Sequence, residues 1–289
     1  MTLRLDAPAA AREHCAATRD KGTRWGFVPT MGALHEGHLA LVRRAKRECG
    51  TVCVSVFVNP LQFNDPRDLE RYPRDFEGDV RLLSSAGCDM VFTGTLEQFF
   101  PEAQGAPQAI RSVDPGPAAL GLEGALRPGH FTGVATIVER LFDFVRPECA
   151  YFGAKDYQQT LVVRHVARVR GGPRIVVCPT ERAPDGLALS SRNALLEPSW
   201  RERAPAIHRA LLAAREAWRG ESLRAAPELA RRMHAVLAQS GLSVEYAALR
   251  DPEAWTEADP RGALSRAVAL IAARAGGVRL IDNLRLDAE

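Results

Sequence analysis

The sequence predicts an α/β protein, with a Rossmann-like doubly wound parallel sheet domain followed by a smaller α+β C-terminal domain. Near-continuous apolar, β-branched runs such as residues 51–58 are typical of strands buried on both faces of a parallel sheet. These runs alternate with segments of helical periodicity, as they do in doubly wound sheets. From residue 198 onward Ala, Leu, Arg and Glu at helical spacing dominate instead. We therefore divide the chain into residues 1–181 and residues 182–289.

Composition limits the class of protein. A net charge of +3 without any Lys/Arg-rich block argues against nucleic acid as a partner of this 289-residue chain. No run approaches the roughly 20 apolar residues that span a membrane, and residues 1–21 lack the apolar region of a signal peptide. The 6 cysteines, none in CxxC spacing, predict buried, reduced thiols in a cytoplasmic protein.

The expected elements of the first domain follow in order. Residues 4–20 have the spacing of an amphipathic helix. Strands are expected at residues 25–28, 51–58, 90–92, 149–152 and 174–178. Helices are expected from residue 38 and at residues 68–72, 75–86, 134–145 and 160–170. Residues 104–126, in which Gly, Pro and small residues dominate, are expected to form a strand flanked by a mobile loop over the site.

The second domain has a different pattern. Two segments of helical period occupy residues 201–220 and 223–240. Three apolar runs follow and predict strands at residues 244–249, 267–273 and 278–284. We interpret this small α+β domain as a lid that carries the loop Ser190-Ser-Arg192.

The stretch of residues 25–42 predicts a nucleotide site. A buried strand, a turn with two glycines and a helix start place free backbone N–H groups at the positive end of a helix, which favours anions. His35 and His38, three residues apart at this end, can donate hydrogen bonds to phosphate oxygens. Gly32 and Gly37 let a charged ligand approach the backbone closely. The same spacing of three excludes the HExxH pattern of zinc proteases.

Other strand-end loops carry cations and hydroxyls. Lys155 and Arg192 can neutralise charge on a transferring phosphoryl group, and Ser190 and Ser191 add hydroxyl donors. Taken alone, Lys155-Asp156 is typical of a surface ion pair and Ser190-Ser-Arg192 of a helix cap. The residues by themselves leave both interpretations open.

Neutral amides and one carboxylate complete the candidate site. Gln62 and Gln159 suit a small polar substrate with hydroxyl and carboxylate groups, because an amide can both donate and accept. Asp79 is a candidate Mg²⁺ ligand beside a triphosphate, although taken alone it is typical of a solvated helix residue. The sequence has no Ser-His-Asp order and no cysteine in a reactive setting. This pattern favours catalysis by positioning and electrostatics, without a covalent enzyme intermediate.

Seven strings, in this order, resemble the pantothenate synthetase family of the nucleotidylyltransferase superfamily, whose HIGH-type motif also occurs in class I aminoacyl-tRNA synthetases. The resemblance extends from about Trp25 to Leu284, and Ser190-Ser-Arg192 resembles the KMSKS-like loop of the superfamily. The strings are Pro29-Thr-Met-Gly-Ala-Leu-His-Glu-Gly-His38, Phe57-Val-Asn-Pro-Leu-Gln-Phe63, Arg71-Tyr-Pro-Arg74, Arg127-Pro-Gly-His-Phe-Thr-Gly-Val134, Tyr151-Phe-Gly-Ala-Lys-Asp-Tyr-Gln-Gln159, Asp185-Gly-Leu-Ala-Leu-Ser-Ser-Arg-Asn193 and Arg279-Leu-Ile-Asp-Asn283.

The resemblance implies an ATP-dependent ligase that joins pantoate and β-alanine through a pantoyl adenylate, releasing pyrophosphate and then AMP. It also implies a homodimer through the first domain, for which the apolar strand at residues 51–58 supplies surface. The implied ATP-binding residues are Met31, Gly32, Ala33, Leu34, His35, Glu36, Gly37, His38, Gly153, Ala154, Lys155, Asp156, Glu181, Leu189, Ser190, Ser191 and Arg192. Of these, the catalytic ones are His35, His38, Lys155, Ser190, Ser191 and Arg192. The implied substrate-binding residues are Gln62, Gln159, Asn59, Tyr72, Arg127 and His130, and Asp79 lies near Mg²⁺.

The sequence departs from the family pattern at three positions. Ala154 stands where Glu is common, Gly78 where an acidic residue is frequent, and Glu181 where the family has an apolar residue near the adenine. Two other functions remain open. Another adenylyl- or cytidylyltransferase, acting on a phosphorylated substrate, would need further cations where this chain has Gln62 and Gln159. An RNA-binding module would need a basic face and stacking aromatics that the sequence does not supply.

Overall fold

In the computed structural model, which describes residues 2–19 and 21–288, the chain separates into two units. The first unit consists of residues up to 119, residues 126–153 and residues 158–179. The second consists of residues 120–125, residues 154–157 and the chain from residue 180 onward. Two short segments that precede residue 181 therefore belong to the second unit. The main division between residues 181 and 182 stays a prediction.

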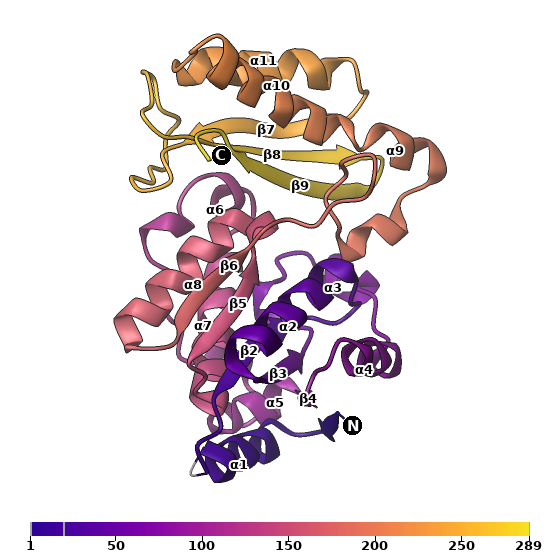
Figure 1. Cartoon of the computed structure of the whole chain (residues 1–289), viewed down its shortest axis with the longest axis vertical. Coiled ribbons are helices and arrows are strands. Elements are labelled where there is room, and N and C mark those ends of the chain that lie inside the picture. Colours follow the sequence, from indigo (N-terminus) through magenta and orange to yellow (C-terminus); the bar gives the residue numbers. More distant parts are fainter. Residues whose placement is uncertain (1, 20, 289) are drawn as a thin grey trace. The chain divides into compact units, whose positions relative to one another are not determined.

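The first unit is built on a six-stranded parallel sheet with the strand order β1-β4-β3-β2-β5-β6 (Figure 1). Its strands are β1 (Leu3–Leu5), β2 (Trp25–Thr30), β3 (Thr51–Val56), β4 (Met90–Phe92), β5 (Cys149–Gly153) and β6 (Arg174–Cys178). The predicted doubly wound sheet is confirmed. The strand order reverses at β2 and β5, which pair with each other, so the loops after these strands lie at the switch point where such sheets bind ligands.

Helices cover both faces of this sheet because successive strand residues point to opposite sides. Phe27 and Phe92 pack with residues of α1 and α7 on one face, whereas Val28 and Val54 pack with residues of α2 and α4 on the other. The helices of this unit are α1 (Pro8–Arg19), α2 (Glu36–Cys49), α3 (Pro66–Arg71), α4 (Phe76–Ser85), α5 (Leu96–Phe99), α7 (His130–Val145) and α8 (Tyr157–Arg170). No helix in the described residues is long and apolar enough to cross a membrane.

The start of one expected helix and one expected strand of this unit are wrong. The pattern predicts a helix at residues 4–20, yet Leu3–Leu5 form β1 beside β4 and the helix begins at Pro8; the expected end, Asp20, lies outside the described residues. Residues 104–126 form no strand but contain short 3₁₀ turns and α6 (Leu122–Leu126). The turns begin at prolines, which lack the N–H that a strand needs to pair.

A third correction concerns the surface expected for a partner subunit. The strand predicted at residues 51–58 ends at Val56 and lies inside the sheet, between β2 and β4. Val52, Cys53 and Val54 are fully buried, so this strand offers no surface to another chain. The prediction for the thiols is confirmed: the 6 cysteines are free, and only Cys49 is not buried.

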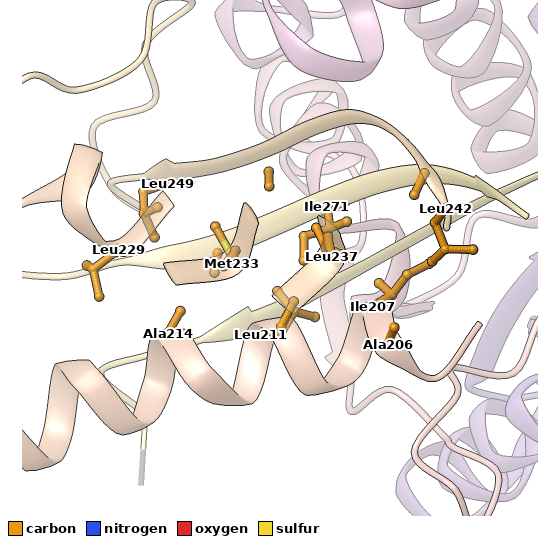
Figure 2. Packing of buried hydrophobic residues seen from close by; sticks show 14 of the residues in the cluster. Ala206, Ile207, Leu211, Ala214, Leu229, Met233, Leu237, Leu242, Leu249 and Ile271 are labelled. Carbon is orange, nitrogen blue, oxygen red and sulfur yellow. The ribbon is translucent and has the colours of Figure 1, made fainter. Parts of the chain in front are cut away.

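The second unit contains the antiparallel strands β7 (Ser243–Arg250), β8 (Val268–Ala275) and β9 (Val278–Arg285). Its helices are α9 (Pro198–Arg203), α10 (Ala206–Gly220) and α11 (Ala226–Ala238), so the helix expected at residues 201–220 is divided, at Pro205. Figure 2 shows Leu211 of α10 and Met233 of α11 packed with Ile271 of β8. The helices thereby cover one face of the sheet with the larger apolar cluster of this unit.

The opposite face of this sheet explains why residues 120–125 and 154–157 belong to this unit. Leu122 and Tyr157 pack with Val268 and Leu270 of β8. Beside them, the Glu123 carboxylate accepts hydrogen bonds from both terminal nitrogens of the Arg279 guanidinium, at 2.6 and 2.8 Å. Both faces of the three-stranded sheet are therefore covered within this unit.

Candidate active site

His35 and His38 lie at the start of α2, directly after β2, and cap each other's main chain. The His35 ring accepts the Gly37 N–H at Nδ1 (3.2 Å), and the His38 ring accepts the His35 N–H at its own Nδ1 (3.4 Å). The ring centroids are 4.2 Å apart. Because each Nδ1 accepts, the proton of each neutral imidazole is on Nε2. Both rings therefore carry an N–H donor of the kind that the binding of phosphate oxygens requires.

The turn before these histidines is held by Asp79 of α4. One carboxylate oxygen accepts the Ala33 N–H (3.0 Å) and the other accepts the Leu34 N–H (2.8 Å). Gly32 has a φ of 81°, and a Cβ on it would lie 2.8 Å from Asp79 Oδ2, so a side chain fits neither the conformation nor the space. Burial raises the pKa of the Asp79 carboxyl above its ordinary value. Asp79 is thus a buried support of the turn at residues 31–34 and not a solvated helix residue.

The expectation that Asp79 binds Mg²⁺ stays a prediction. Both of its oxygens accept main-chain hydrogen bonds, and the side chain is buried. Within residues 2–19 and 21–288, no group of three or more His, Cys, Asp or Glu side chains could hold a metal ion. Asp79 could therefore supply only a single carboxylate beside an ion held mainly by phosphate oxygens, and we derive no step of the reaction through a metal.

Gln62 follows β3 in the 3₁₀ turn η1 (Pro60–Gln62) and is 8% exposed. Its Oε1 accepts a hydrogen bond from Asn59 Nδ2 (3.0 Å), and its main-chain oxygen lies 2.8 Å from His130 Nδ1. A carbonyl oxygen can only accept, so His130 carries its proton on Nδ1, and its Nε2 accepts from Arg127 (3.2 Å). The structure thus brings four of the predicted substrate-binding residues together in one cluster.

Main-chain groups fix which end of the Asn59 amide donates. Asn59 Oδ1 accepts the Leu61 N–H (3.2 Å), and Nδ2 donates to the Gly133 oxygen (3.2 Å) as well as to Gln62. Gly133 comes this close because it has no side chain: a Cβ would lie 2.1 Å from the Leu61 oxygen. With Asn59 fixed, Oε1 of Gln62 is the acceptor and Nε2 is left as a donor. Gln62 therefore presents its Nε2–H groups as donors, while Oε1 keeps one lone pair beside the bond from Asn59, so the expectation that this amide both donates and accepts stays a prediction.

The remaining substrate-binding candidates differ in their contacts. Tyr72, at the end of α3, is buried, and its ring lies edge-on to Phe63, with 5.8 Å between centroids. Gln159 of α8 is half-buried, and its side-chain amide makes no hydrogen bond within the part of the chain that the structure describes. Its neighbour Gln158 is buried and donates to the Ala118 oxygen (2.9 Å). Of these adjacent amides, Gln159 is the one with capacity for a ligand.

Lys155 follows β5 in the 3₁₀ turn η5 (Ala154–Asp156) and belongs to the second unit. Its ammonium group lies 3.2 Å from Asp156 Oδ1, and its side chain is 18% exposed. A partly exposed pair of this kind contributes little to stability. The main chain of this turn is held from β9, since Asn283 Nδ2 donates to the oxygens of Ala154 (2.8 Å) and Lys155 (2.7 Å).

Ser190 is the cap of the 3₁₀ segment η6 (Ser191–Leu195), because its Oγ accepts the Arg192 N–H (3.2 Å). The helix-cap interpretation is therefore confirmed, and the hydroxyl proton remains for a ligand. Just upstream, the Leu189 N–H donates to the Glu181 oxygen (2.9 Å). Glu181 takes part through its main chain, so this contact does not depend on the side chain that departs from the family pattern.

Sequence reasoning assigned no role to a buried polar cluster on β9. Asp282 and Asn283 are 4% and 7% exposed, and Asp282 forms a two-pronged ion pair with Arg182, at 2.6 and 2.9 Å. The available signal was two adjacent polar residues that end an apolar run in an expected strand.

The candidate residues are divided between the two units. Those of the first unit are Met31, Gly32, Ala33, Leu34, His35, Glu36, Gly37, His38, Asn59, Gln62, Tyr72, Asp79, Arg127, His130, Gly153 and Gln159. Those of the second are Ala154, Lys155, Asp156, Glu181, Leu189, Ser190, Ser191 and Arg192. Histidines and amides thus belong to one unit, and the cations Lys155 and Arg192 to the other.

Comparisons with known proteins identify what the chain is similar to. Residues 4–285 match the family model for pantoate-beta-alanine ligase. Pantothenate synthetase of Rubrobacter xylanophilus is 50% identical over 289 residues, covering 98% of each chain. That of Thermus thermophilus is 50% identical over 267 residues, covering 90% of this chain and 92% of that one.

Solved structures give the same answer for the fold. The crystal structure of pantothenate synthetase from Thermus thermophilus superposes with a TM-score of 0.87 at 44% identity, covering 99% of each chain. Pantoate-beta-alanine ligase from Francisella tularensis, solved as a complex with Beta-gamma ATP and Beta-alanine, has a TM-score of 0.78 at 32% identity. It covers 100% of this chain and 99% of that one.

Proposed function

Because the chain belongs to the pantoate–β-alanine ligase family, we propose that it forms pantothenate through an enzyme-bound pantoyl adenylate. Its activity is the ligation of pantoate with β-alanine, with ATP as co-substrate. This assignment excludes the other nucleotidylyltransferases and the RNA-binding module left open by the residues alone. The observation that best supports an adenylate intermediate is the geometry of His35 and His38. Their Nδ1 atoms accept main-chain hydrogen bonds, so their Nε2–H groups are suited to bind phosphate oxygens.

In the first step a carboxylate oxygen of pantoate attacks the α-phosphorus of ATP. The bond from that phosphorus to the bridging oxygen breaks, and pyrophosphate leaves. His35 and His38 donate from Nε2 to phosphate oxygens, while Lys155 and Arg192 neutralise the charge that develops on them. Gln62 donates from Nε2 to an oxygen of pantoate, and Gln159 holds the same substrate.

In the second step the amine of β-alanine attacks the acyl carbon of the adenylate. The bond from that carbon to the phosphate oxygen breaks, AMP leaves with that oxygen, and the amine loses a proton. Cys88 and Cys178 are unsuited as covalent nucleophiles, because burial raises the pKa of Cys88 to about 12 and also raises the pKa of Cys178. A thiol that stays protonated is a weak nucleophile.

Oxygen transfer tests this scheme. Pantoate labelled with oxygen-18 in its carboxylate should give labelled AMP, because the oxygen that attacks phosphorus stays on it. Exchange of labelled pyrophosphate into ATP should require pantoate but not β-alanine. Label found in inorganic phosphate, or retained entirely in pantothenate, would contradict the adenylate.

The assembly, the compartment and the metal complete the proposal. The protein works as a homodimer in the cytoplasm, and Mg²⁺ accompanies ATP. Family resemblance supports the dimer and the metal, with Asp79 as the candidate ligand, and the free thiols fit a reducing compartment. Sedimentation at micromolar concentration tests the dimer, and a monomer there would contradict it.

A further inference from the structure

Asp282 and Asn283 are adjacent on β9 and contact two segments of the second unit that carry site residues. Asn283 Nδ2 donates to the main-chain oxygens of Ala154 and Lys155, at 2.8 and 2.7 Å. Asp282 accepts two hydrogen bonds from the Arg182 guanidinium and one from the Asn283 N–H (2.8 Å). Both strand residues are buried, so these bonds form out of contact with water.

Arg182 extends this cluster to the segment that leads into the Ser190 loop. Its guanidinium also donates to the Gly186 oxygen (3.1 Å) and to the Asn283 oxygen (3.4 Å). Arg182 pairs with Ala188 in an antiparallel bridge, and Ser190 follows two positions later. One buried cluster therefore holds the main chain of both segments that carry the cations.

We propose that Asn283, supported by Asp282 and Arg182, is a positioning residue that holds Lys155 for adenylate formation. The proposal rests on the catalytic role proposed above for Lys155. A single amide bonded to two successive carbonyl oxygens fixes the orientation of both peptide units that flank Lys155, one between residues 154 and 155 and the other between residues 155 and 156. That orientation sets the direction in which the Lys155 side chain leaves the backbone.

The hydrogen-bond types explain why the residue at 283 is an amide and not a carboxylate. Carbonyl oxygens only accept, so the atom facing Ala154 and Lys155 must be a donor. Asp282 supplies the negative charge that Arg182 requires, and its bond from the Asn283 N–H fixes the main chain at this position. The pair thus separates two tasks: Asp282 binds Arg182, and Asn283 holds the turn.

The test uses Asn283→Asp and Asn283→Ala in the full-length enzyme, alone and combined with Lys155→Ala. Asn283→Asp keeps the shape of the side chain but places an oxygen opposite two carbonyl oxygens. We expect kcat for ATP–pyrophosphate exchange to fall about tenfold to hundredfold in either variant, the scale for misplacing a catalytic group. The KM for pantoate should stay within about twofold, because its contacts are elsewhere. In the Lys155→Ala background the same changes should lower kcat by less than about twofold.

Tyr246→Phe is the matched control. It removes one hydrogen bond to a buried partner in the same unit, from Tyr246 to Glu123 (2.8 Å), and should lower Tm without changing kcat. If Asn283→Ala fails to fold, Arg182→Lys provides a second variant that keeps the charge beside Asp282 but loses the two-pronged bond. It should lower kcat in the same direction and by less.

The outcomes separate this proposal from the one on which it rests. The positioning role would be overturned if the loss of kcat in the double variant equalled the product of the losses in the two single variants. A near-normal kcat in a folded Asn283→Ala would overturn it as well. Either result would leave the catalytic role of Lys155 intact. Near-normal activity of Lys155→Ala by itself would overturn the role of Lys155 and the present proposal with it. A kcat loss in the Asn283 variants that disappears in the Lys155→Ala background supports it.

Discussion

The two units hold their candidate site residues by different means. In the first, Gln62 is buried, and its amide is oriented by Asn59, which is itself fixed by two main-chain groups. In the second, Lys155 and Arg192 are on 3₁₀ segments whose main chain is held, while their side chains remain partly exposed. One unit fixes atoms of side chains, and the other fixes the backbone from which long side chains extend.

This difference matches the roles that we propose for the residues. An amide recognises a substrate through directional hydrogen bonds, so its orientation must be set before the substrate arrives. A lysine acts through a charge on a flexible stem with three rotatable donors, and Coulomb attraction depends on distance far more than on angle. In the proposed roles, selectivity for the acid therefore requires rigid side chains, whereas neutralisation of phosphate charge tolerates mobile ones.

The largest expected effect compares one residue from each unit. Lys155→Ala and His38→Ala should each lower kcat/KM by about a hundredfold to a thousandfold, the scale for losing one preorganised charge or donor. Lys155 is in the 3₁₀ turn after β5 and His38 is in the first turn of α2, outside the buried clusters, so circular dichroism should show an intact fold, with at most a small fall in Tm for His38→Ala from the lost cap. Near-normal activity of either variant would show that the substituted residue is not a catalytic group.

A smaller effect is expected from the amide that orients Gln62. Asn59→Asp keeps the shape but turns a donor into an acceptor opposite Gln62 Oε1, so the Gln62 amide should reverse. Steady-state kinetics should show kcat/KM for pantoate falling about tenfold to hundredfold, with the KM for ATP within about twofold. Gln62→Ala should give the same pattern. A raised KM for ATP with normal use of pantoate would mean that the two substrates are assigned the wrong way round.

Asp79→Asn tests the support of the nucleotide loop. The new amide has one acceptor for two N–H groups, so the free energy of unfolding should fall by about 2 kcal/mol and the KM for ATP should rise several-fold. The Mg²⁺ concentration for half-maximal activity should not change if Asp79 acts only on the loop. A shift in that concentration would instead support the predicted metal ligand. Asp75→Asn, at the exposed cap of α4, is the matched control and should behave as wild type.

The smallest effect concerns the pH dependence of stability in the second unit. His208 Nδ1 is buried, and within the described residues it has no hydrogen-bond partner. Burial, together with Arg182 and Arg215, lowers the pKa of His208 below 6.5 and outweighs Asp282. Above the pKa that His208 has in the unfolded chain, its imidazole is neutral in both the folded and the unfolded state. Below that pKa, the imidazole of the unfolded chain binds a proton before that of the folded chain does, which favours the unfolded state. Stability should therefore decline as the pH falls below about 6.5.

His208→Gln should make that decline shallower, as measured by Tm from about pH 7 to pH 5. His234→Gln, on the exposed surface of α11, is the control and should leave the decline unchanged. An identical decline of Tm in wild type and His208→Gln would show that His208 does not cause the loss of stability at low pH.

Local pattern predicted the layers of the fold because burial leaves a local signature. Residues 90–92 and 174–178 form strands with the predicted bounds, since apolar runs between turn residues have few alternatives. The strand expected within residues 104–126 was wrong because frequent Gly and Pro indicate only that regular helix or strand periodicity is lost. They do not specify which turns form instead. The motif residues were found by the same local strings, as with His35 and His38.

The contacts that hold the site could not be predicted in this way. Asp79 binds the nucleotide loop across 45 and 46 positions, and Asn283 binds the Lys155 turn across 128 positions. Such partners meet only after the strands have paired, so no window of the sequence contains both. The orientation of the Gln62 amide could not be predicted for the same reason. It is set by Asn59, and Asn59 is oriented in part by the Gly133 oxygen, 74 positions away.

The order of segments along the chain determines whether the two predicted domains could be produced as separate polypeptides. Leu122 and Tyr157 pack on the β7–β9 sheet, although both precede residue 181. A fragment of residues 1–181 would expose these side chains, and a fragment of residues 182–289 would leave Leu270 and its neighbours bare. Two separately translated halves should therefore aggregate alone and recover activity only when refolded together. A recombination event that moved the C-terminal half into another protein would need to bring both short segments with it.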